Sequence, residues 1–506
     1  MIKFNKKFLV AIMALLLIAS TIFVAVSAAT TPVTQTNNAY TGTAPKYVFM
    51  FIGDGMSYSQ IYAAEAYKGK TLYDPKTVGI GRLNFTTFPV AGSATTYDAS
   101  SICPDSASTA TSMASGHKTL SGIINMNTDK TVKYKTIAEM AKGTGYKVGV
   151  ISSVSINHAT PAAYYAHQAS RSNYYDIGIE LSNSNFDFFG GGGFLQQKGA
   201  KDDQKDLLDI AKGKGYLVVN NKKDILAVNN KSGKVIAINS VLDNEKALPY
   251  EIDRSADDLS LADFTRKGID VLDNSKGFFL MVEGGKIDWT CHANDATTSI
   301  KDTFAFENAV AEALKFYAKH PKDTLILVTA DHETGGLTIG FAGTGYSTFY
   351  EKLAYQKKSY AVFDETIKNY IAGTTPEKAK LEDLLPAIRD SFGLVTSTDS
   401  SAAGRPDMVL TDYEVQTLRN ALAQSALPSA ERKYTDSDKI LYGTYEPLSV
   451  TITHILDNKA GIAWTSYAHT GVPVPVFAYG AGQNLFNGYY DNTDIFNKLH
   501  SILKIK

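Results

Sequence analysis

The stretch YVFMFIGDG, residues 47–55, shows the pattern that decides the fold of this 506-residue chain. Six apolar residues, enough for one strand, lead directly into a glycine and Asp54. Runs that are apolar on both faces are typical of buried, mostly parallel strands. Four further runs repeat the pattern: KVGVIS (147–152), GFFLMV (277–282), TLILVT (324–329) and VPVFAYG (474–480).

Helical segments lie between these runs. They include KTIAEMAKGTG (135–145) and residues 298–319, where apolar residues recur near i, i+3/i+4 spacing. We therefore predict an α/β fold, a three-layer sandwich with a central, mostly parallel β-sheet flanked by helices. Residues from about 340 to 460 differ, because they combine amphipathic helices, such as 411–424, with a Ser/Thr/Asp/Gly-rich piece at 396–407. We interpret this interval as a helical and irregular insertion.

The N-terminal segment has the features of an export signal. Three lysines precede an apolar run from Phe8 to about Val26, and Val26-Ser27-Ala28 fits a cleavage site. We predict a signal peptide at 1–28, a flexible leader at 29–45 and a main domain at 46–506 that contains the insertion. The protein would then be secreted, periplasmic or at the cell surface. An uncleaved anchor is the alternative, because the apolar run is long enough to span a bilayer.

Charge and cysteine content exclude several classes of protein. The formal net charge is −1, and loss of residues 1–28 removes three lysines and moves it to −4. A nearly neutral chain favours neither nucleic acid nor an anionic membrane surface as a partner. Without the signal we expect no membrane contact, since no second stretch is long and apolar enough to span a bilayer. Two cysteines, Cys103 and Cys291, are too few for a disulfide scaffold. We favour two reduced thiols, with a single bridge as the alternative.

Polar side chains gather directly after the predicted strands. In open α/β sheets, ligands bind beyond the carboxyl ends of the strands, so these side chains would meet at one edge. Each has an ordinary explanation by itself: a capping aspartate in a turn, a surface charge pair or a helix start. Together they favour a metal site, because so many carboxylates at one edge would repel each other without cations. The residues are Asp54, His158, Thr160, Glu283, Asp288, His292, Asp331 and His332.

The side-chain types indicate which metals fit. Mixed Asp and His ligands suit zinc at sites that keep an open position. A set of Asp, Glu and a threonine hydroxyl offers only oxygen and suits magnesium. The spacing of Asp288 and His292 puts both on one face of a helical turn, and His469, before the last apolar run, adds a further imidazole.

Ser106 lies in the hydroxyl-rich stretch CPDSASTATSMASGHKT, residues 103–119, without a histidine close upstream. A serine coordinated to zinc has a lowered hydroxyl pKa and can attack without a neighbouring base. The residues that follow Asp105 can form a helix, and a helix N-terminus favours an anion at Ser106. The alternative is that Asp105 or Ser106 only caps this helix.

Taken together, these motifs resemble the alkaline phosphatases. They occur in the order of that family and cover most of the chain outside the leader and the insertion. The motifs are FIGDGM (51–56), PDSASTAT (104–111), NHATPAAYYAHQASR (157–171), VEGGKIDWTCH (282–292), TADHETGG (329–336) and AHTGVPVPV (468–476).

The resemblance implies a site with two Zn²⁺ and one Mg²⁺. The implied ligands are Asp288, His292 and His469 for the first zinc, Asp54, Asp331, His332 and the nucleophile Ser106 for the second, and Asp54, Thr160 and Glu283 for magnesium. It also implies that Arg171 binds phosphate through its planar fork and that Asp105 orients this arginine.

Two positions differ from better-known bacterial members of the family, which carry Asp and Lys there. This chain has His158 and Trp289. His158 would hydrogen-bond a metal-bound water or ligate a metal. Trp289 lacks the ammonium that would contact phosphate through water, and our hypothesis is that phosphate leaves faster as a result.

The implied reaction is hydrolysis of small-molecule phosphate monoesters through zinc-activated Ser106 and a phosphoserine intermediate. The alternatives are a phosphodiesterase of the same superfamily, a related cofactor-independent phosphoglycerate mutase and an inactive metal- or phosphate-binding surface protein. A sulfatase would carry Cys/Ser-x-Pro-x-Arg at its nucleophile, and this pattern is absent around Ser106. Homodimers are common in the family, and this sequence neither requires nor excludes one.

Overall fold

The computed structural model describes residues 40–72, 78–428, 432 and 434–505. The predicted signal peptide and residues 29–39 of the predicted leader lie outside the described residues, so both remain predictions. Residues Gly42–Lys506 form one compact unit, and every element below belongs to it.

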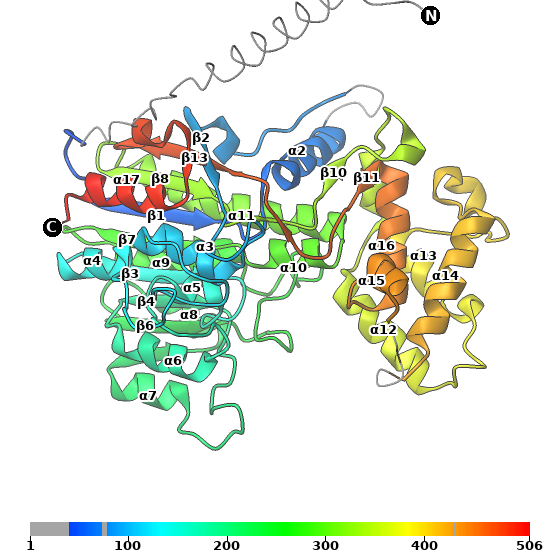
Figure 1. The fold of residues 1–506 in the computed structure, drawn as a ribbon, viewed down its shortest axis with the longest axis horizontal. Helices are drawn as coiled ribbons and strands as arrows, with labels where there is room; N and C mark the ends of the chain where they lie inside the picture. Colours follow the sequence, from blue (N-terminus) through cyan, green and yellow to red (C-terminus); the bar gives the residue numbers. More distant parts are fainter. Residues whose placement is uncertain (1–39, 73–77, 429–431, 433, 506) are drawn as a thin grey trace, which may run out of the picture. The chain divides into compact units, whose positions relative to one another are not determined.

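A ten-stranded sheet forms the middle layer (Figure 1). The strands are β1 (Tyr47–Ile52), β2 (Val90–Thr95), β3 (Lys147–Ser152), β4 (Phe188–Gly191), β5 (Tyr216–Val219), β6 (Lys234–Ile238), β7 (Phe278–Glu283), β8 (Thr324–Thr329), β13 (Val474–Gly480) and β14 (Gly488–Asp491). Their order across the sheet is β14-β2-β13-β8-β1-β7-β3-β4-β6-β5. In the described part of the chain β13 is antiparallel to both its neighbours, and every other pair of this sheet is parallel. The predicted mostly parallel sheet is therefore confirmed.

All five predicted apolar runs are strands of this sheet. Four of them lie side by side at its centre, in the order β8-β1-β7-β3. Every residue of β1, β7 and β8 is buried, as expected for strands covered on both faces. The fifth run is the antiparallel β13, whose direction depends on its long-range partners and not on its apolar residues. The sequence pattern did not reveal the other five strands, three of which have only four residues.

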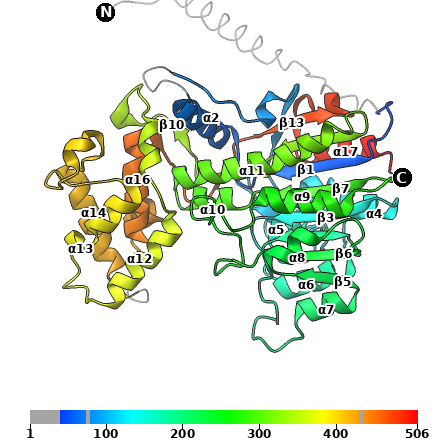
Figure 2. The ribbon, with the colours of Figure 1, turned by 180° about the vertical axis from the view of Figure 1, so that it is seen from behind.

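Helices cover both faces of the sheet (Figures 1 and 2). In one layer α11 packs against α2 and α9, and in the other α3 packs against α4, α5 and α17. The bounds are α2 (Tyr58–Leu72), α3 (Ser106–Ser115), α4 (Ile137–Gly143), α5 (Ala159–Ala162), α6 (Tyr174–Asn183), α7 (Leu207–Gly213), α8 (Lys222–Ala227), α9 (Leu261–Leu272), α10 (Lys286–His292), α11 (Ala296–Tyr317) and α17 (Thr493–Leu503). The predicted three-layer architecture is confirmed.

Helix α9 illustrates why these segments are helical. Ser260 and Asp263 form a capping box, in which each side chain accepts a hydrogen bond from the other residue's backbone N–H. The apolar residues Leu261, Phe264 and Val271 recur at helical spacing and are buried. Burial of each such large side chain contributes about 1.5–3 kcal/mol, which holds the helix against the sheet.

The interval predicted as an insertion forms a helical lobe, yellow to orange in Figure 1. The short strands β10 (Thr338–Ile339) and β11 (Ile462–Ala463) pair antiparallel and bring its two ends together. The helices between them are α12 (Tyr360–Ala372), α13 (Leu381–Phe392), α14 (Asp412–Ser425), α15 (Asp436–Tyr442) and α16 (Pro447–Ala460), with several short 3₁₀ turns. The helix α16 contacts α11 of the main domain as well as α12, α14 and α15. The helical and irregular character of the interval is confirmed.

Two features bear on the remaining predictions from composition. Cys103 is exposed, Cys291 is buried, and both are free thiols, as we favoured from the sequence. Within the described ranges, no helix combines the length and the apolar character that a membrane crossing requires.

Candidate active site

The carboxyl ends of the four central strands are level with one another. Ile52 at the end of β1 pairs with Thr329 of β8 and with Glu283 of β7. Glu283 also pairs with Ser152 at the end of β3. The segments that follow these strands therefore start at one edge of the sheet, where the sequence predicted that polar side chains would meet.

Asp54 is held in the tight turn that follows β1. The backbone N–H of Gly55 donates to Asp331 Oδ1 at 3.2 Å, which ties this turn to the one after β8. Gly55 has φ +70°, and a Cβ there would lie 2.9 Å from the Cα of Asp288. Glycine is required at this point by the left-handed backbone and by the close approach of α10. Thr160, in α5, donates to Asp54 Oδ2 at 3.2 Å.

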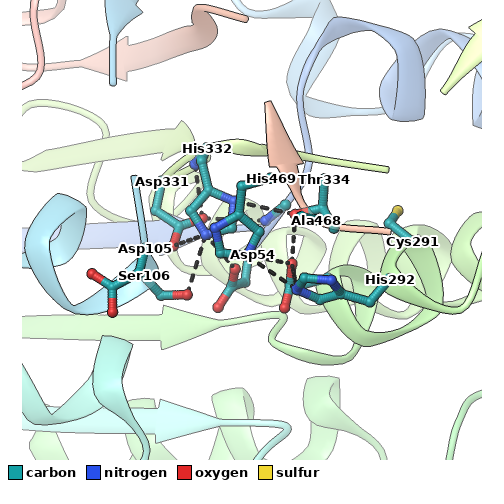
Figure 3. Close-up of polar contacts among 12 residues, drawn as sticks. Asp54, Asp105, Ser106, Cys291, His292, Asp331, His332, Thr334, Ala468 and His469 are labelled. Atoms are coloured by element: carbon teal, nitrogen blue, oxygen red, sulfur yellow. Dashed lines mark hydrogen bonds and ion pairs between the residues drawn. The ribbon is translucent and has the colours of Figure 1, made fainter. Parts of the chain in front are cut away.

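Asp54, Asp331 and His332 form a buried group whose ligand atoms all lie within 4.8 Å of one another (Figure 3). His332 Nε2 is 3.2 Å from Asp331 Oδ2 and 3.5 Å from Asp54 Oδ1. Ser106 Oγ approaches the same nitrogen to 3.2 Å. Among the described residues, Asp54 Oδ1 and Asp331 Oδ2 have no hydrogen-bond partner although both are buried. A set of buried oxygen and nitrogen atoms that can donate lone pairs is what a metal ion requires.

Thr334 sets the tautomer of His332. Its hydroxyl lies 2.5 Å from Asp288 Oδ1 and donates to that carboxylate. The same Thr334 oxygen is 3.2 Å from His332 Nδ1 and can therefore only accept from it. His332 then carries its proton on Nδ1 and presents the Nε2 lone pair to the carboxylates and to Ser106.

Asp288, His292 and His469 form a second group beside the first. The two imidazoles approach to 3.0 Å through their Nε2 atoms, and Asp288 Oδ1 lies 3.4 Å from His292 Nε2 and 3.6 Å from His469 Nε2. His292 lies on α10 with Asp288, at the predicted spacing. His469 arrives through β12 (His469–Thr470), which pairs antiparallel with β9 (Glu333–Thr334).

The outer nitrogens of these two imidazoles are bound to backbone carbonyls. His292 Nδ1 donates to the carbonyl of Tyr467 and His469 Nδ1 to that of Pro104, each at 2.6 Å. In the neutral rings both Nε2 atoms therefore present lone pairs, which face each other at 3.0 Å. Two facing lone pairs repel each other and require a cation between the rings. Burial lowers the pKa of His292, but Asp288 outweighs this and raises it to about 9, so a proton can take this place, as a metal ion does in histidine–metal sites with a second hydrogen bond to each ring.

Three carboxylates at this edge, those of Asp54, Asp331 and Glu283, disfavour the ionised state. Desolvation by burial, followed by the charges of Asp331 and Asp288, raises the pKa of Asp54 well above its ordinary value. Burial and then Asp288 raise the pKa of Asp331 to about 8. Burial raises the pKa of Glu283 to about 7, although hydrogen bonds from Ser152 and Thr160 oppose this. Bound cations reverse this balance and favour the ionised forms.

Glu283 and Thr160 place further oxygens next to Asp54. Glu283 Oε2 accepts a hydrogen bond from Ser152, and Oε1 is buried without a hydrogen-bond partner in the described chain. His158 is the residue before α5, and its ring packs edge-on against Trp289 with centroids 5.9 Å apart. Burial, and then the charge of Arg171, lower the pKa of His158 to about 3, so this ring is neutral.

Ser106 is the first residue of α3, as the stretch around it predicted. Asp105 caps the helix and accepts from the backbone N–H of Ser108 at 3.0 Å through Oδ1. Its other oxygen accepts from Arg171 at 3.0 Å. Burial raises the pKa of Asp105, but the Arg171 guanidinium and the backbone hydrogen bonds outweigh it and lower this pKa. In Figure 3 the Asp105 carboxylate points away from the Ser106 hydroxyl, a geometry that fits an orienting role and not that of a base.

Seven of the predicted site residues line one pocket. It has a volume of about 470 Å³ and holds Ser106, His158, Arg171, Asp288, Trp289, His292 and His469. The structure thus brings every predicted site residue to this edge of the sheet, while their roles remain predictions. Sequence reasoning missed Glu245, Tyr360 and Tyr445, which also line the pocket. No local motif surrounds these three. Thr334 was also missed, although it lies inside the motif TADHETGG.

Comparisons with known proteins agree with this site. Residues 45–505 match the family model described as alkaline phosphatase. Alkaline phosphatase 3 of Bacillus subtilis (strain 168) is 32% identical over 471 residues, which cover 91% of this chain and 89% of that protein. The crystal structure of a cold-active alkaline phosphatase from Shewanella sp. is similar with a TM-score of 0.72 and 31% identity, over 90% of this chain and 99% of that one.

A more distant structure supports the fold alone. The alkaline phosphatase of Thermus thermophilus has a TM-score of 0.74 at 23% identity, over 94% of this chain and 96% of that one. The matched region contains all the strands and helices that carry the site residues. On these grounds the chain belongs to the alkaline phosphatase family and is a phosphomonoesterase.

Proposed function

We propose that this enzyme hydrolyses small-molecule phosphate monoesters through attack by Ser106 and a phosphoserine intermediate. One observation carries the proposal. The Ser106 hydroxyl is 3.2 Å from His332 Nε2, and buried oxygens of Asp54 and Asp331 that have no hydrogen-bond partner among the described residues converge on the same point. A hydroxyl among such donors is a nucleophile that a metal can activate.

The donor set fits the metals that the family uses. The alkaline phosphatase family is metal-dependent, and the orphaned carboxylate oxygens and facing imidazole nitrogens support bound cations. We propose two Zn²⁺ and one Mg²⁺ per chain, since His-containing sets suit zinc and an all-oxygen set suits magnesium. The proposed ligands are Asp288, His292 and His469 for one zinc, Asp54, Asp331, His332 and Ser106 for the other, and Asp54, Thr160 and Glu283 for magnesium, with His158 beside it.

When bound, the metals supply Lewis-acid chemistry that lowers the pKa of the Ser106 hydroxyl and of the attacking water and stabilises the leaving alkoxide. The chain contributes the position of the nucleophile. Ser106 is held at the N-terminus of α3, a helix in which all ten residues are buried. The partial positive charge of this helix end favours the anionic form of Ser106 and the phosphate bound next to it.

Arg171 orients the phosphate. Its guanidinium donates to Asp105 Oδ2 at 3.0 Å and to His158 Nε2 at 3.4 Å, so its plane is fixed from two sides. A guanidinium held in this way can donate to two equatorial phosphate oxygens at once. Asp105 is therefore a positioning residue, because it acts through Arg171.

The reaction has two displacement steps at phosphorus. In the first, Ser106 Oγ gives up its proton to solvent, the bond between Ser106 Oγ and phosphorus forms, the bond from phosphorus to the alcohol oxygen breaks, and the leaving alkoxide takes up a proton. In the second, a water molecule gives up a proton as its oxygen attacks phosphorus, the bond to Ser106 Oγ breaks, Ser106 takes up a proton again, and inorganic phosphate leaves. In-line displacement needs one metal on the Ser106 side of phosphorus and one on the side of the leaving oxygen, the roles that we propose for the two zinc ions.

The experiment that tests the proposal compares Ser106→Ala with Cys103→Ser. Cys103 is an exposed thiol in the segment just before α3. With p-nitrophenyl phosphate, we expect Ser106→Ala to lose turnover by a factor on the order of 10³ or more, while Cys103→Ser keeps it. Acid quenching and mass spectrometry should find phosphate on Ser106 of the wild type. Near wild-type turnover of Ser106→Ala would overturn the proposal.

Metal content and substrate type complete the test. Elemental analysis should find about two zinc and one magnesium per chain, the stoichiometry that the ligand chemistry favours, and a chelator should remove activity that added metal restores. Bis(p-nitrophenyl) phosphate should be hydrolysed more slowly than the monoester. Faster diester hydrolysis would favour the phosphodiesterase alternative.

We also propose that residues 1–28 are a signal peptide, that 29–45 are a leader and that 46–506 form the catalytic domain with an insertion at about 340–460. The mature protein would be secreted, periplasmic or at the cell surface, free of the membrane and able to form a homodimer. N-terminal sequencing of exported protein and sedimentation of the purified chain test these points.

A further inference from the structure

A second cavity adjoins the catalytic pocket. It has a volume of about 670 Å³ and shares Glu245, Trp289, Tyr360 and Tyr445 with the pocket that contains Ser106. We call it the aromatic groove, defined by the rings of Tyr250, Trp289, Tyr360 and Tyr445 and by the carboxylates around them. Since the cavities share four residues, the groove is open to the alcohol part of an ester whose phosphate lies on Ser106.

The groove has one wall from the main domain and one from the insertion. Tyr250 and Trp289 belong to the first wall, and Tyr360 and Tyr445 to the second. The hydroxyls of Tyr250 and Tyr360 are hydrogen-bonded to each other at 2.9 Å. The ring of Tyr445 stands edge-on to that of Tyr360, with centroids 6.2 Å apart. These contacts fix the rings that a ligand would meet.

All ionisable side chains that line the groove, tyrosines apart, are acidic. They are Asp243, Glu245, Asp253, Asp364, Glu365 and Glu446, and no lysine, arginine or histidine lines it. Asp243, Glu365 and Glu446 have ion pairs with Lys286, Lys368 and Arg432. Glu245, Asp253 and Asp364 form none within the described residues. The groove therefore has three carboxylates next to its aromatic rings that form no ion pair with a cationic side chain of the described chain.

One ammonium of the chain already binds to this wall. Lys286 is 1% exposed, and its Nζ lies 3.7 Å from the centre of the Tyr250 ring and 4.7 Å from that of Trp289. The same Nζ is bound to Asp243 at 2.6 Å. A combination of ring face and carboxylate thus satisfies a buried cation here. In the described chain no cation lies over the rings of Tyr360 and Tyr445.

We propose that the aromatic groove binds the alcohol part of the substrate and that this alcohol carries an ammonium group. The proposal rests on the proposed function of Ser106 and names its substrate class. Tyrosine and tryptophan faces attract ammonium groups, and carboxylates that lack a cationic partner strengthen this attraction. The same carboxylates repel a second phosphate, so nucleoside di- and triphosphates are poor substrates.

Burial disfavours the ionised form of two groove carboxylates, and a bound cation would favour it. Desolvation raises the pKa of Asp253, and it raises that of Asp364 to about 7 despite a hydrogen bond from Ser449. A cation in the groove favours the ionised form of both groups.

Two esters of the same shape test the proposal. Phosphocholine carries a quaternary ammonium, and 3,3-dimethylbutyl phosphate replaces its nitrogen with carbon. The ratio of their kcat/KM values is measured for the wild type and for the double variant Asp253→Asn, Asp364→Asn. The double variant should lower this ratio about tenfold, because each carboxylate contributes about fivefold or less. Comparison of this ratio between the two enzymes cancels the intrinsic difference in reactivity between the two leaving groups.

Glu377→Gln is the matched control, since Glu377 is an exposed carboxylate of the insertion outside the groove. It should keep the ratio of the wild type. An equal ratio in the wild type and the double variant would overturn the proposal. If the double variant fails to fold, Tyr445→Leu gives the same comparison on the aromatic side.

A binding measurement separates this proposal from that for Ser106. Calorimetry on the metal-loaded enzyme should give a choline Kd about tenfold lower than that of 3,3-dimethylbutanol. If phosphocholine and p-nitrophenyl phosphate are not hydrolysed at all, the proposed function fails, and the choline measurement still decides whether the groove binds an ammonium. Equal Kd values for the two alcohols contradict the groove proposal even in an active phosphatase.

Discussion

The catalytic pocket and the aromatic groove adjoin each other but are built in opposite ways. The pocket takes its polar groups from the ends of β1, β3, β7 and β8 and from the start of α3. The groove takes its rings from segments that are distant in the sequence. Tyr250 and Tyr360, whose hydroxyls are hydrogen-bonded to each other, are 110 residues apart. Half of the groove belongs to the insertion, whereas every predicted metal ligand belongs to the main domain.

This difference separates two tasks. Positions on adjacent strands in register are held by the backbone hydrogen bonds of the sheet, so they suit groups that must not move during catalysis. The groove depends on packing between a helical lobe and the main domain, and such surfaces can change without disturbing the sheet. We therefore expect substitutions in the pocket to act on the chemistry for every ester, and those in the groove to act on the choice of alcohol.

The largest expected effect comes from His332, which faces both Ser106 and the buried carboxylates. His332→Ala should lower kcat for every ester by a factor on the order of 10³ and should reduce bound zinc, because metal catalysis supplies several kcal/mol. Activity assays and elemental analysis measure the two effects. The control His500→Ala removes an imidazole from α17, far from the described site residues in sequence. A His332→Ala enzyme with full metal content would contradict the ligand assignment.

A smaller effect is expected from Arg171, because it binds the phosphate without taking part in bond making. Arg171→Lys loses the fork that Asp105 and His158 hold, and kcat/KM should fall by a factor on the order of 10². Inhibition by inorganic phosphate should weaken in parallel. Arg254→Lys provides the control, since Arg254 forms a similar pair with Glu251. Equal losses for an ammonium-bearing and a neutral ester would sharpen the distinction between pocket and groove.

His167 tests how the segment that carries Arg171 is stabilised. Burial lowers its pKa, but hydrogen bonds to Glu139 and Glu180 outweigh this and raise it from 6.5 to about 9. A raised pKa in the folded state stabilises the fold fully below about pH 6.5, and this contribution is lost as the pH rises through about 9. The free energy of unfolding in urea should therefore fall by about 1–3 kcal/mol over this range. His167→Gln should remove most of this pH dependence, and an unchanged profile would refute the assignment.

The smallest effect is expected from Trp289, which lines both the pocket and the groove. Our hypothesis is that phosphate leaves fast because position 289 has no ammonium group. Trp289→Lys introduces one there. Inhibition by phosphate should become stronger and kcat should become lower, each by roughly a few-fold, because one water-mediated charge contact changes the affinity by about this factor. Measured Ki and kcat values that both equal those of the wild type would disprove the hypothesis. Trp289→Phe controls for the loss of the indole.

The success of the sequence-based predictions follows this same division. The central strands were predictable because burial on both faces requires a continuous apolar run, as in YVFMFI. Asp54, Glu283 and Asp331 were predictable because they follow those runs directly, whereas Ser106, Arg171 and His469 were identified from motifs that resemble the family. Strands β2, β4, β5, β6 and β14 were missed, since four of them have only four or five residues and β2 alternates small and polar residues, so none carries a long apolar run. Tyr360, at the start of α12, and Tyr445, between α15 and α16, were missed because the local sequence of the insertion gives no sign of what these side chains face.

The sequence alone determined the α/β architecture, the set of metal-ligand candidates and Ser106 as the nucleophile candidate, because apolar runs encode the first and short local motifs encode the other two. Only the tertiary structure decided which nitrogen each imidazole presents, through Thr334 and the carbonyls of Tyr467 and Pro104. It alone also placed four aromatic rings and six carboxylates in one cavity beside the site. Most of these features depend on contacts between residues more than a hundred positions apart, and the role of Thr334 depends on Asp288, 46 positions away, so no local pattern specifies them.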